Sequence, residues 1–177
     1  YTSWLVQEGY EVTAVDISGE MMALAKKKLA AIKVNTANVK PVHWWHADIT
    51  AILDQLETYD GIFSMTAFEF VPEPENVLKK LFSRLKPGGC IMIGLIAGMS
   101  AWSEYYAEAA RNKPTSVFAR AALYTKEEIG SWQIGVPAEI GECLFFPPNV
   151  QTTAEALSLE EKREGNPGFV VAKWVKG

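Results

Sequence analysis

The segment Cys90 to Ile96 is an almost unbroken apolar run of strand length, Cys-Ile-Met-Ile-Gly-Leu-Ile. Such runs are typical of strands that helices cover on both faces, because a half-exposed strand alternates apolar and polar residues. The segment Lys86-Pro87-Gly88-Gly89 comes directly before the run and is rich in residues that end helices. We therefore expect a helix that ends near Lys86 and a buried strand over residues 90–96.

Three earlier segments also have strand character, and helical patterns separate them. The predicted strands cover residues 12–16, residues 41–48 and the segment that begins Tyr59-Asp60. The predicted helices cover residues 2–8, the segment that Ser18 caps, residues 52–56 and the segment that begins at Pro72 and Pro74. Apolar residues at helical spacing support two of these helices: Met21, Leu24, Ala25, Leu29 and Ile32 in one, and Leu78, Leu81, Phe82 and Leu85 in the other. Strands that alternate with helices predict a parallel sheet between two helical layers.

The C-terminal part of the chain departs from this alternation. Residues 139–146 and 168–175 have strand character, and we find no convincing crossover helix between them. Proline and glycine residues flank the connection, so we expect the two strands to form a long hairpin. The predicted fold class is therefore α/β: a three-layer sandwich with a doubly wound, mostly parallel sheet and an antiparallel C-terminal strand.

Residues 98–132 form the least sheet-like region. The aromatic residues Trp102, Tyr105, Tyr106 and Phe118 crowd an amphipathic stretch, and Thr125 begins a capping-box pattern. Because the region follows the carboxyl end of a strand, we expect it above the sheet edge where ligands bind, as a lid or substrate-side insertion. The alternative is a helix that packs its aromatic side chains on the core.

Composition limits the class of protein. A chain of 177 residues with 49% apolar content can bury a core, and we predict a single domain over residues 1–177. The net charge of −4 argues against a nucleic-acid partner, and no apolar stretch approaches the roughly 20 residues that span a bilayer. Cys90 and Cys143 lack CxxC spacing, and His43 and His46 would face opposite sides of a strand, so no metal site is predicted. We expect a cytoplasmic location.

Two of the predicted strands end in an acid, Asp16 and Asp48, one strand–helix–strand step apart. We therefore expect both carboxylates at the same edge of the sheet, where doubly wound folds bind ligands. One carboxylate there can accept hydrogen bonds from two ribose hydroxyls, and an acid one strand over can accept from the amine of a base. The alternative for each acid is a helix cap. That alternative is weaker for Asp16, because Ser18 already offers a cap and the apolar Ile17 and Met21 follow.

Taken in order, these segments resemble the class I S-adenosyl-L-methionine-dependent methyltransferases. These enzymes have a Rossmann-like fold, and the resemblance is to the type that methylates small molecules. Residues 9–28 are similar to that family's second-strand motif, residues 46–49 to its third-strand acid, and residues 59–95 to its fourth strand, helix and fifth strand. The last match is the most specific, because Tyr59-Asp60, Val71-Pro72 and the Leu85–Gly89 series occur in the family's order. The resemblance implies methyl transfer from S-adenosylmethionine to an unidentified small-molecule acceptor.

The resemblance also implies roles for single residues. Asp16 would bind the ribose hydroxyls, with Ile17 and Met21 beside the adenine. Asp48 would accept a hydrogen bond from the adenine amine, with Ala47 and Ile49 beside it. Ser64, Met65 and Thr66 would line the site of the methionine end. Many relatives carry a histidine near the position of Glu69, and this chain does not, so no catalytic residue is assigned; Glu69, Tyr105 and Tyr106 are the candidates. Methyl transfer depends mainly on alignment of the reactants, which is compatible with the lack of a catalytic dyad.

The family's first strand and glycine-rich turn have no counterpart here, because the predicted helix at residues 2–8 follows them in the family. We expect these segments to precede Tyr1 in a longer chain, since a parallel sheet without a central strand leaves backbone groups unpaired; the alternative is a damaged cofactor site. Two other classes remain open. An NAD-dependent oxidoreductase also places an acid after its second strand, and a non-catalytic nucleotide-binding relative would keep the same fold.

Overall fold

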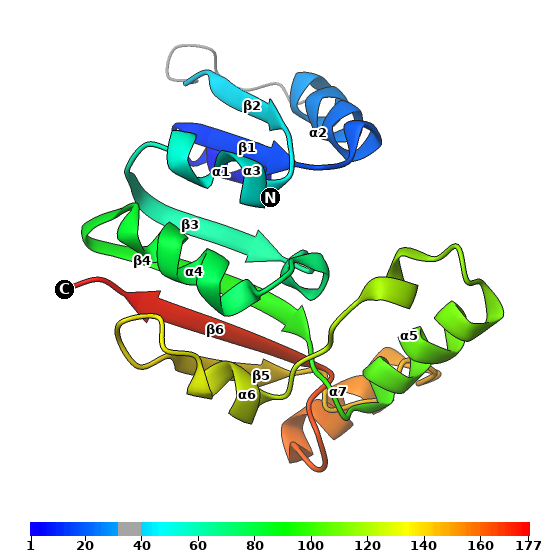
Figure 1. The fold of residues 1–177 in the computed structure, drawn as a ribbon. Helices are drawn as coiled ribbons and strands as arrows, with labels where there is room; N and C mark the ends of the chain where they lie inside the picture. The colour runs from blue at the N-terminus through cyan, green and yellow to red at the C-terminus, as the bar shows by residue number, and fades with distance from the viewer. Residues whose placement is uncertain (32–39) are drawn as a thin grey trace. The chain divides into compact units, whose positions relative to one another are not determined.

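The computed structural model describes residues 1–31 and 40–177 (Figure 1). The chain divides into two compact units, residues 1–56 and residues 57–177, and each unit is described by itself. The predicted helix position Ile32 lies outside the described residues.

The first unit is built around two parallel strands. Its elements are α1 (Thr2–Gln7), β1 (Val12–Asp16), α2 (Gly19–Ala31), β2 (Val42–His46), α3 (Ile49–Ile52) and the 3₁₀ turn η2 (Leu53–Gln55). Helix α1 ends before Gly9, whose φ of +85° suits glycine, and Ser18 accepts a hydrogen bond from the Met21 amide at 3.2 Å to start α2. Strands β1 and β2 pair in parallel, with Asp16 opposite His46. Both strands therefore end at the same edge, as the sequence predicts.

The second unit contains a four-stranded sheet in the order β3-β4-β6-β5 (Figure 1). Its elements are β3 (Tyr59–Met65), η3 (Phe68–Phe70), α4 (Pro74–Ser83), β4 (Leu85–Ile96), α5 (Ala101–Asn112), η4 (Val117–Arg120), α6 (Lys126–Ser131), β5 (Glu139–Cys143), α7 (Thr153–Lys162) and β6 (Phe169–Val175). Strands β3 and β4 are parallel, while β6 runs antiparallel to both β4 and β5. The predicted α/β fold class with an antiparallel C-terminal strand is confirmed.

The core of the second unit lies on β4 and β6. Ile91, Leu95, Ala172 and Trp174 have no exposed surface, and Leu78 of α4 is equally buried. Residues 93–96 are buried without interruption, as expected for a strand covered on both faces. The apolar run that begins at Cys90 therefore forms the centre of this unit.

Two features of the second unit differ from the sequence prediction. Helix α4 ends at Ser83, and β4 begins at Leu85, which pairs with Tyr59, while Cys90 pairs with Gly61. Leu85 therefore belongs to β4 and not to the helix. Residues 86–89 form a bulge within β4, where the pairing with β3 shifts in register, and the helix ends before them. The second difference is α7, which lies within the connection between β5 and β6. Thr152 caps α7 by accepting from the Glu155 amide at 3.1 Å.

Candidate functional site

The first candidate site lies at the carboxyl end of β1. Asp16 ends this strand, and its Oδ1 accepts the Ser18 amide at 2.8 Å. Among the residues that the structure describes, no lysine or arginine forms an ion pair with Asp16. The second carboxylate oxygen has no hydrogen bond to any described residue, so it can accept one from a ligand.

Two apolar side chains lie exposed beside this acid. Ile17 is 68% exposed and Met21 is 54% exposed. Exposed large apolar side chains next to a carboxylate suit a ligand with a flat apolar part and neighbouring hydroxyls. His46 Nε2 lies 3.1 Å from the carbonyl oxygen of Ile17, a contact between β2 and the turn after β1 that the sequence did not predict.

Asp48 lies close to the same edge, because the Ala47 amide donates to the Asp16 carbonyl at 3.1 Å. Asp48 caps α3, which begins at Ile49: its Oδ1 accepts both the amide and the hydroxyl of Thr50, each at 2.8 Å. The helix cap that sequence reasoning left open is therefore present. The structure brings together the six predicted nucleoside-side residues, Asp16, Ile17, Met21, Ala47, Asp48 and Ile49, within the first unit.

The other predicted site residues belong to the second unit. Ser64 and Met65 end β3, and Thr66 follows with a left-handed backbone (φ 50°), its amide donating to the Gly94 carbonyl at 2.8 Å. Met99 after β4 (φ 56°) and Leu144 after β5 (φ 61°) adopt the same conformation. Non-glycine residues pay a cost for this conformation and often mark functional sites. None of these positions carries glycine or asparagine, the residues that favour this conformation, so the sequence does not predict these turns.

Glu69 lies in η3, four residues after the end of β3, and is 1% exposed. Its Oε1 accepts the Ile96 amide at 2.9 Å, its carbonyl accepts the Ala122 amide at 2.8 Å, and its Oε2 has no partner among the described residues. Burial raises the pKa of Glu69, an effect that the hydrogen bond from Ile96 partly offsets. Glu69 thus connects η3, the end of β4 and the segment after η4.

An aromatic row connects the elements beyond the ends of β3 and β4. The ring centroids are 5.7 Å apart for Phe70 and Phe118, 4.2 Å for Phe118 and Tyr106, 6.4 Å for Tyr106 and Trp102, and 6.2 Å for Trp102 and Phe146. Tyr105 packs edge-on against Tyr106 and is 52% exposed. Figure 1 shows α5, which carries both tyrosines, beyond the carboxyl ends of these strands.

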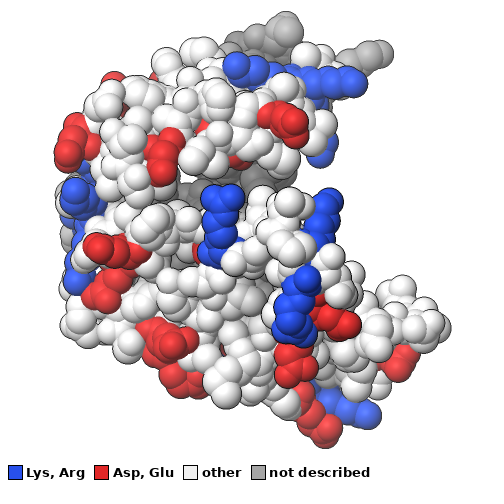
Figure 2. All heavy atoms as spheres, turned by 45° about the vertical axis from the view of Figure 1, so that its right-hand side comes forward, with Lys and Arg blue, Asp and Glu red and all other residues white. Residues whose placement is uncertain are grey.

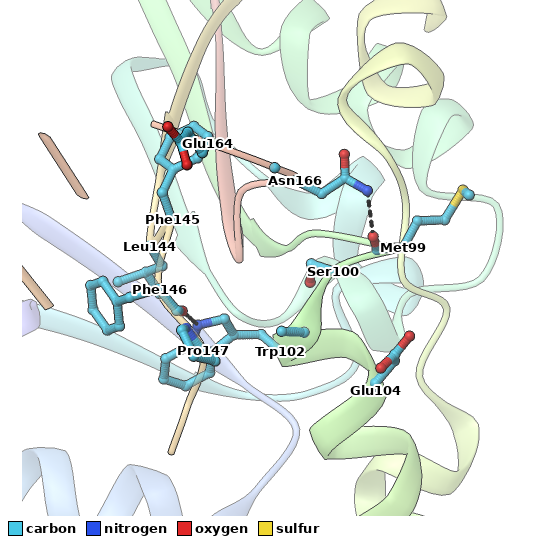
Figure 3. A pocket seen from close by; sticks show the side chains of 12 residues that line it. Met99, Ser100, Trp102, Glu104, Leu144, Phe145, Phe146, Pro147, Glu164 and Asn166 are labelled. Atoms are coloured by element: carbon cyan, nitrogen blue, oxygen red, sulfur yellow. Dashed lines mark hydrogen bonds between the residues drawn. The ribbon is translucent and has the colours of Figure 1, made fainter. Parts of the chain in front are cut away.

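A pocket of about 310 Å³ adjoins this aromatic row in the second unit (Figure 3). Three segments form its walls: residues 99–104 from the start of α5, residues 144–147 after β5, and residues 164–166 before β6. The sequence indicates Trp102 as a candidate residue of this region, but no sequence pattern links it to residues 144–147 or 164–166.

Other kinds of site find less support in the described residues. In the described part of the chain, no three His, Cys, Asp or Glu residues cluster as metal ligands would. No helix within residues 1–31 and 40–177 has the length and apolar content needed to cross a bilayer. Figure 2 shows acidic and basic side chains interspersed on the face it presents.

The fold of the whole chain is that of solved S-adenosylmethionine-dependent methyltransferases. The structure of one such enzyme from Thermotoga maritima is similar over 98% of this chain and 76% of its own, with a TM-score of 0.63 and 21% identity. The magnesium protoporphyrin IX methyltransferase of Synechocystis, solved with bound S-adenosylhomocysteine, is similar over 98% of this chain and 67% of its own, with a TM-score of 0.62 and 15% identity.

The profile described as "Methyltransferase domain" matches residues 1–93, and the chain therefore belongs to this family. Among curated relatives, the malonyl-[acyl-carrier protein] O-methyltransferase of Enterobacter lignolyticus is 30% identical over 92 residues, 52% of this chain and 33% of the relative. The ubiquinone biosynthesis O-methyltransferase of Serratia proteamaculans is 27% identical over 99 residues, 55% of this chain and 39% of the relative. The chain thus spans between a third and two fifths of the length of these relatives. The predicted resemblance to class I methyltransferases is confirmed.

Proposed function

We propose that the protein transfers the methyl group of S-adenosylmethionine to a small-molecule acceptor. The observation that carries this proposal is the open carboxylate of Asp16 between the exposed side chains of Ile17 and Met21, in a chain that belongs to the methyltransferase-domain family. The relatives' names differ, since one specifies malonyl-[acyl-carrier protein] and another specifies ubiquinone biosynthesis, so family membership alone does not identify the acceptor.

The first unit would hold the nucleoside. Asp16 accepts hydrogen bonds from the ribose hydroxyls, and Ile17 and Met21 pack on the adenine. Asp48 uses the oxygen that Thr50 leaves open to accept from the adenine amine, with Ala47 and Ile49 beside the ring. Each contact uses an atom that has no competing ion pair among the described residues.

The second unit would hold the methionine end and the acceptor. Ser64, Met65 and Thr66 follow β3 and supply polar and apolar atoms at its carboxyl end. Bound S-adenosylmethionine supplies a methyl group that is already activated for in-line displacement. The residues of this chain then have to orient the acceptor and exclude water, and the aromatic row beyond β3 and β4 is our candidate for both tasks. Tyr105 and Tyr106 belong to that row, and Glu69 fixes neighbouring backbone by accepting the amides of Ile96 and Ala122.

A ligand-protection experiment tests this proposal. S-adenosylhomocysteine should raise the thermal unfolding temperature of the protein in a concentration-dependent way, and NADH should not. Protection by NADH alone would favour an oxidoreductase and contradict the proposal.

Replacement of Asp16 by alanine tests the named contact. We expect the affinity for S-adenosylhomocysteine to fall by about 1–3 kcal/mol, because a charged acceptor of two hydrogen bonds is lost. Glu20→Ala is the matched control, since this exposed acid lies in the first turn of α2 and faces no predicted contact. Equal affinities of Asp16→Ala and the native protein would contradict the assignment of the ribose site.

We also propose a cytoplasmic location. Cys90 and Cys143 are both free and half-buried, and burial raises the pKa of the Cys143 thiol, which keeps it protonated and unreactive. Unpaired cysteines of this kind are typical of reducing compartments. Fractionation of cells that produce the protein would test this location.

A further inference from the structure

The pocket of Figure 3 has the properties of a preformed binding site. Its volume of about 310 Å³ lies at the lower end of the range for small-molecule pockets. Side-chain hydrogen bonds hold its three segments together: Trp102 Nε1 donates to the Phe146 carbonyl at 2.7 Å, and Asn166 Nδ2 donates to the Met99 carbonyl at 2.7 Å. Each bond joins segments that are more than 40 residues apart in the chain.

The wall after β5 is fixed as well. Glu160 of α7 accepts the Leu144 amide at 3.2 Å with Oε1 and the Phe145 amide at 2.7 Å with Oε2. These bonds stabilise the left-handed conformation of Leu144, which turns Phe145 and Phe146 toward their positions in the pocket wall. The pocket therefore does not need a ligand in order to form.

The charged side chains that line the pocket are both acids. Glu104 lies on the α5 side and Glu164 on the side of the turn before β6, and no lysine, arginine or histidine is among the lining residues (Figure 3). Neither glutamate forms an ion pair with a described residue. The guanidinium of Arg163 lies over the Phe145 ring, 4.5 Å from its centroid. Its Nη2 is 3.6 Å from an oxygen of Glu142, so Arg163 forms an ion pair with Glu142 and not with Glu104 or Glu164.

The rest of the lining is largely aromatic. Trp102 and Phe146 contribute rings whose faces attract cations, and Trp attracts them more strongly than Phe. The third ring, Phe145, already has Arg163 over it. Two carboxylates and two rings without a bound cation favour an organic cation and repel carboxylates and phosphates, since the one cation beside the lining, Arg163, is paired with Glu142.

We propose that this pocket binds the acceptor, and that the acceptor is an apolar amine that binds in its protonated form: an ammonium group attached to an aromatic or aliphatic body. Before transfer the nitrogen loses its proton to water or to one of the two carboxylates, because only the lone pair of the neutral amine can form the bond to the methyl carbon as the carbon–sulfur bond breaks. The inference rests on the proposed methyltransferase function, because it assigns the pocket to that reaction. The apolar body of the acceptor lies against Trp102 and Phe146, and Glu104 and Glu164 neutralise its charge.

Three probes that share a phenylethyl body test the charge preference: phenethylamine, 3-phenylpropanoate and 2-phenylethanol. Their binding is measured by calorimetry at low ionic strength in the presence of S-adenosylhomocysteine. We expect phenethylamine to bind about 10-fold more tightly than 3-phenylpropanoate, with the alcohol between them, and we expect 0.5 M salt to reduce the difference. Equal or tighter binding of the carboxylate would overturn the proposal.

Variants connect the preference to the two acids. In the double variant Glu104→Gln, Glu164→Gln, phenethylamine affinity should fall by about 3- to 10-fold, since both carboxylates are exposed and each contributes modestly. The control is Glu108→Gln, Glu161→Gln, which removes two exposed acids close to the first pair in the chain, one from α5 and one from the end of α7, outside the pocket lining. An amine preference that survives in the first double variant, or that disappears equally in the control, would overturn the assignment.

The same experiments separate this inference from the proposed function. S-adenosylhomocysteine should bind the Glu104→Gln, Glu164→Gln variant as it binds the native protein. If the native protein binds phenethylamine selectively but gains no protection from S-adenosylhomocysteine, the methyltransferase proposal fails while the charge preference of the pocket stands. If S-adenosylhomocysteine protects and the amine preference is absent, only the acceptor class is overturned.

Discussion

The two units of this protein place their carboxylates in opposite ways. In the first unit, Asp16 and Asp48 end strands or begin a helix, and each bonds to a residue only two positions further along the chain. In the second unit, Glu69 is buried and bonds to Ile96, 27 residues away, and its backbone bonds to Ala122. The oxygens of Asp16 and Asp48 that bond to no described residue belong to half-exposed side chains, whereas the unpaired oxygen of Glu69 is buried in a side chain that joins distant segments.

Apolar side chains show the same difference. Ile17, Met21 and Leu24 of the first unit are each more than 40% exposed, while Ile91 and Trp174 of the second unit have no exposed surface. Exposed apolar surface next to a polar site marks a binding region, and completely buried apolar surface supplies stability. The comparison predicts that substitutions of Asp16, Ile17 or Met21 change ligand affinity and that those of Glu69, Ile91 or Trp174 change the free energy of unfolding.

The largest loss of stability is expected for Glu69→Ala. The substitution leaves the Ile96 amide without its acceptor and creates a cavity, so the free energy of unfolding should fall by about 2–4 kcal/mol. Urea denaturation measures it. Glu69→Gln is the control, because its amide oxygen can still accept from Ile96, and we expect it to retain most of the stability.

Methyl transfer by Glu69→Gln then separates two roles for this residue. A positioning role predicts that the glutamine variant keeps its activity and that only the alanine variant loses it. Loss of activity in a folded, S-adenosylhomocysteine-binding glutamine variant would make Glu69 the general base instead.

The next effect in size is expected for Gly168→Ala. A Cβ at this position would overlap the indole of Trp102, with atoms at 2.7 and 2.8 Å, and the ring is held by its bond to Phe146. Overpacking of this kind costs about 1–3 kcal/mol, and it should also weaken phenethylamine binding because Trp102 lines the pocket. Gly130→Ala is the control, since its Cβ would meet no atom within 4 Å and alanine favours the helix α6. Equal stabilities of the two variants would show that Trp102 can move aside without cost.

A smaller effect concerns pH. The folded protein binds the Glu69 proton more tightly than the unfolded chain does, because burial raises its pKa from an ordinary value of about 4.5. The stability contributed by the neutral carboxyl is therefore complete below pH 4.5 and is lost as the pH rises through the raised pKa. Glu69→Gln cannot ionise, so its free energy of unfolding relative to the native protein should increase over that interval. Parallel pH curves for the two proteins would contradict this assignment.

Sequence patterns predicted those parts of the fold that short stretches of chain determine. Strand β1 and the Ser18 cap depend on neighbouring residues, and both were predicted at the observed positions. The start of β4 was misplaced, because Leu85 enters the strand through its pairing with Tyr59, a partner 26 residues away. Helix α7 was missed although Thr152 and Glu155 have the spacing of a helix start, because the flanking proline and glycine residues indicated a loop.

The candidate site divides in the same way. The positions of the six predicted nucleoside-side residues follow from two strand ends, and from the turns and helices after them, that a parallel sheet places together. The pocket does not, because Trp102 meets Phe146 across 44 residues and Asn166 meets Met99 across 67. The left-handed turns at Met99 and Leu144 carry no glycine that would reveal them. Local patterns specify which residues can bind, and only the tertiary fold specifies which of them meet.

The smallest effect on stability is expected for Asp16→Ala, which tests the difference between Asp16 and Glu69 directly. This variant loses one hydrogen bond, from the Ser18 amide, while Ser18 itself still caps α2. The free energy of unfolding without ligand should fall by no more than about 1 kcal/mol, well below the loss in Glu69→Ala, although the affinity for S-adenosylhomocysteine falls clearly. Denaturation of the two variants side by side, with and without S-adenosylhomocysteine, measures both quantities. A loss of stability in Asp16→Ala as large as that in Glu69→Ala would mean that the strand-end acid is structural, because a residue kept open for a ligand contributes little to the unliganded fold.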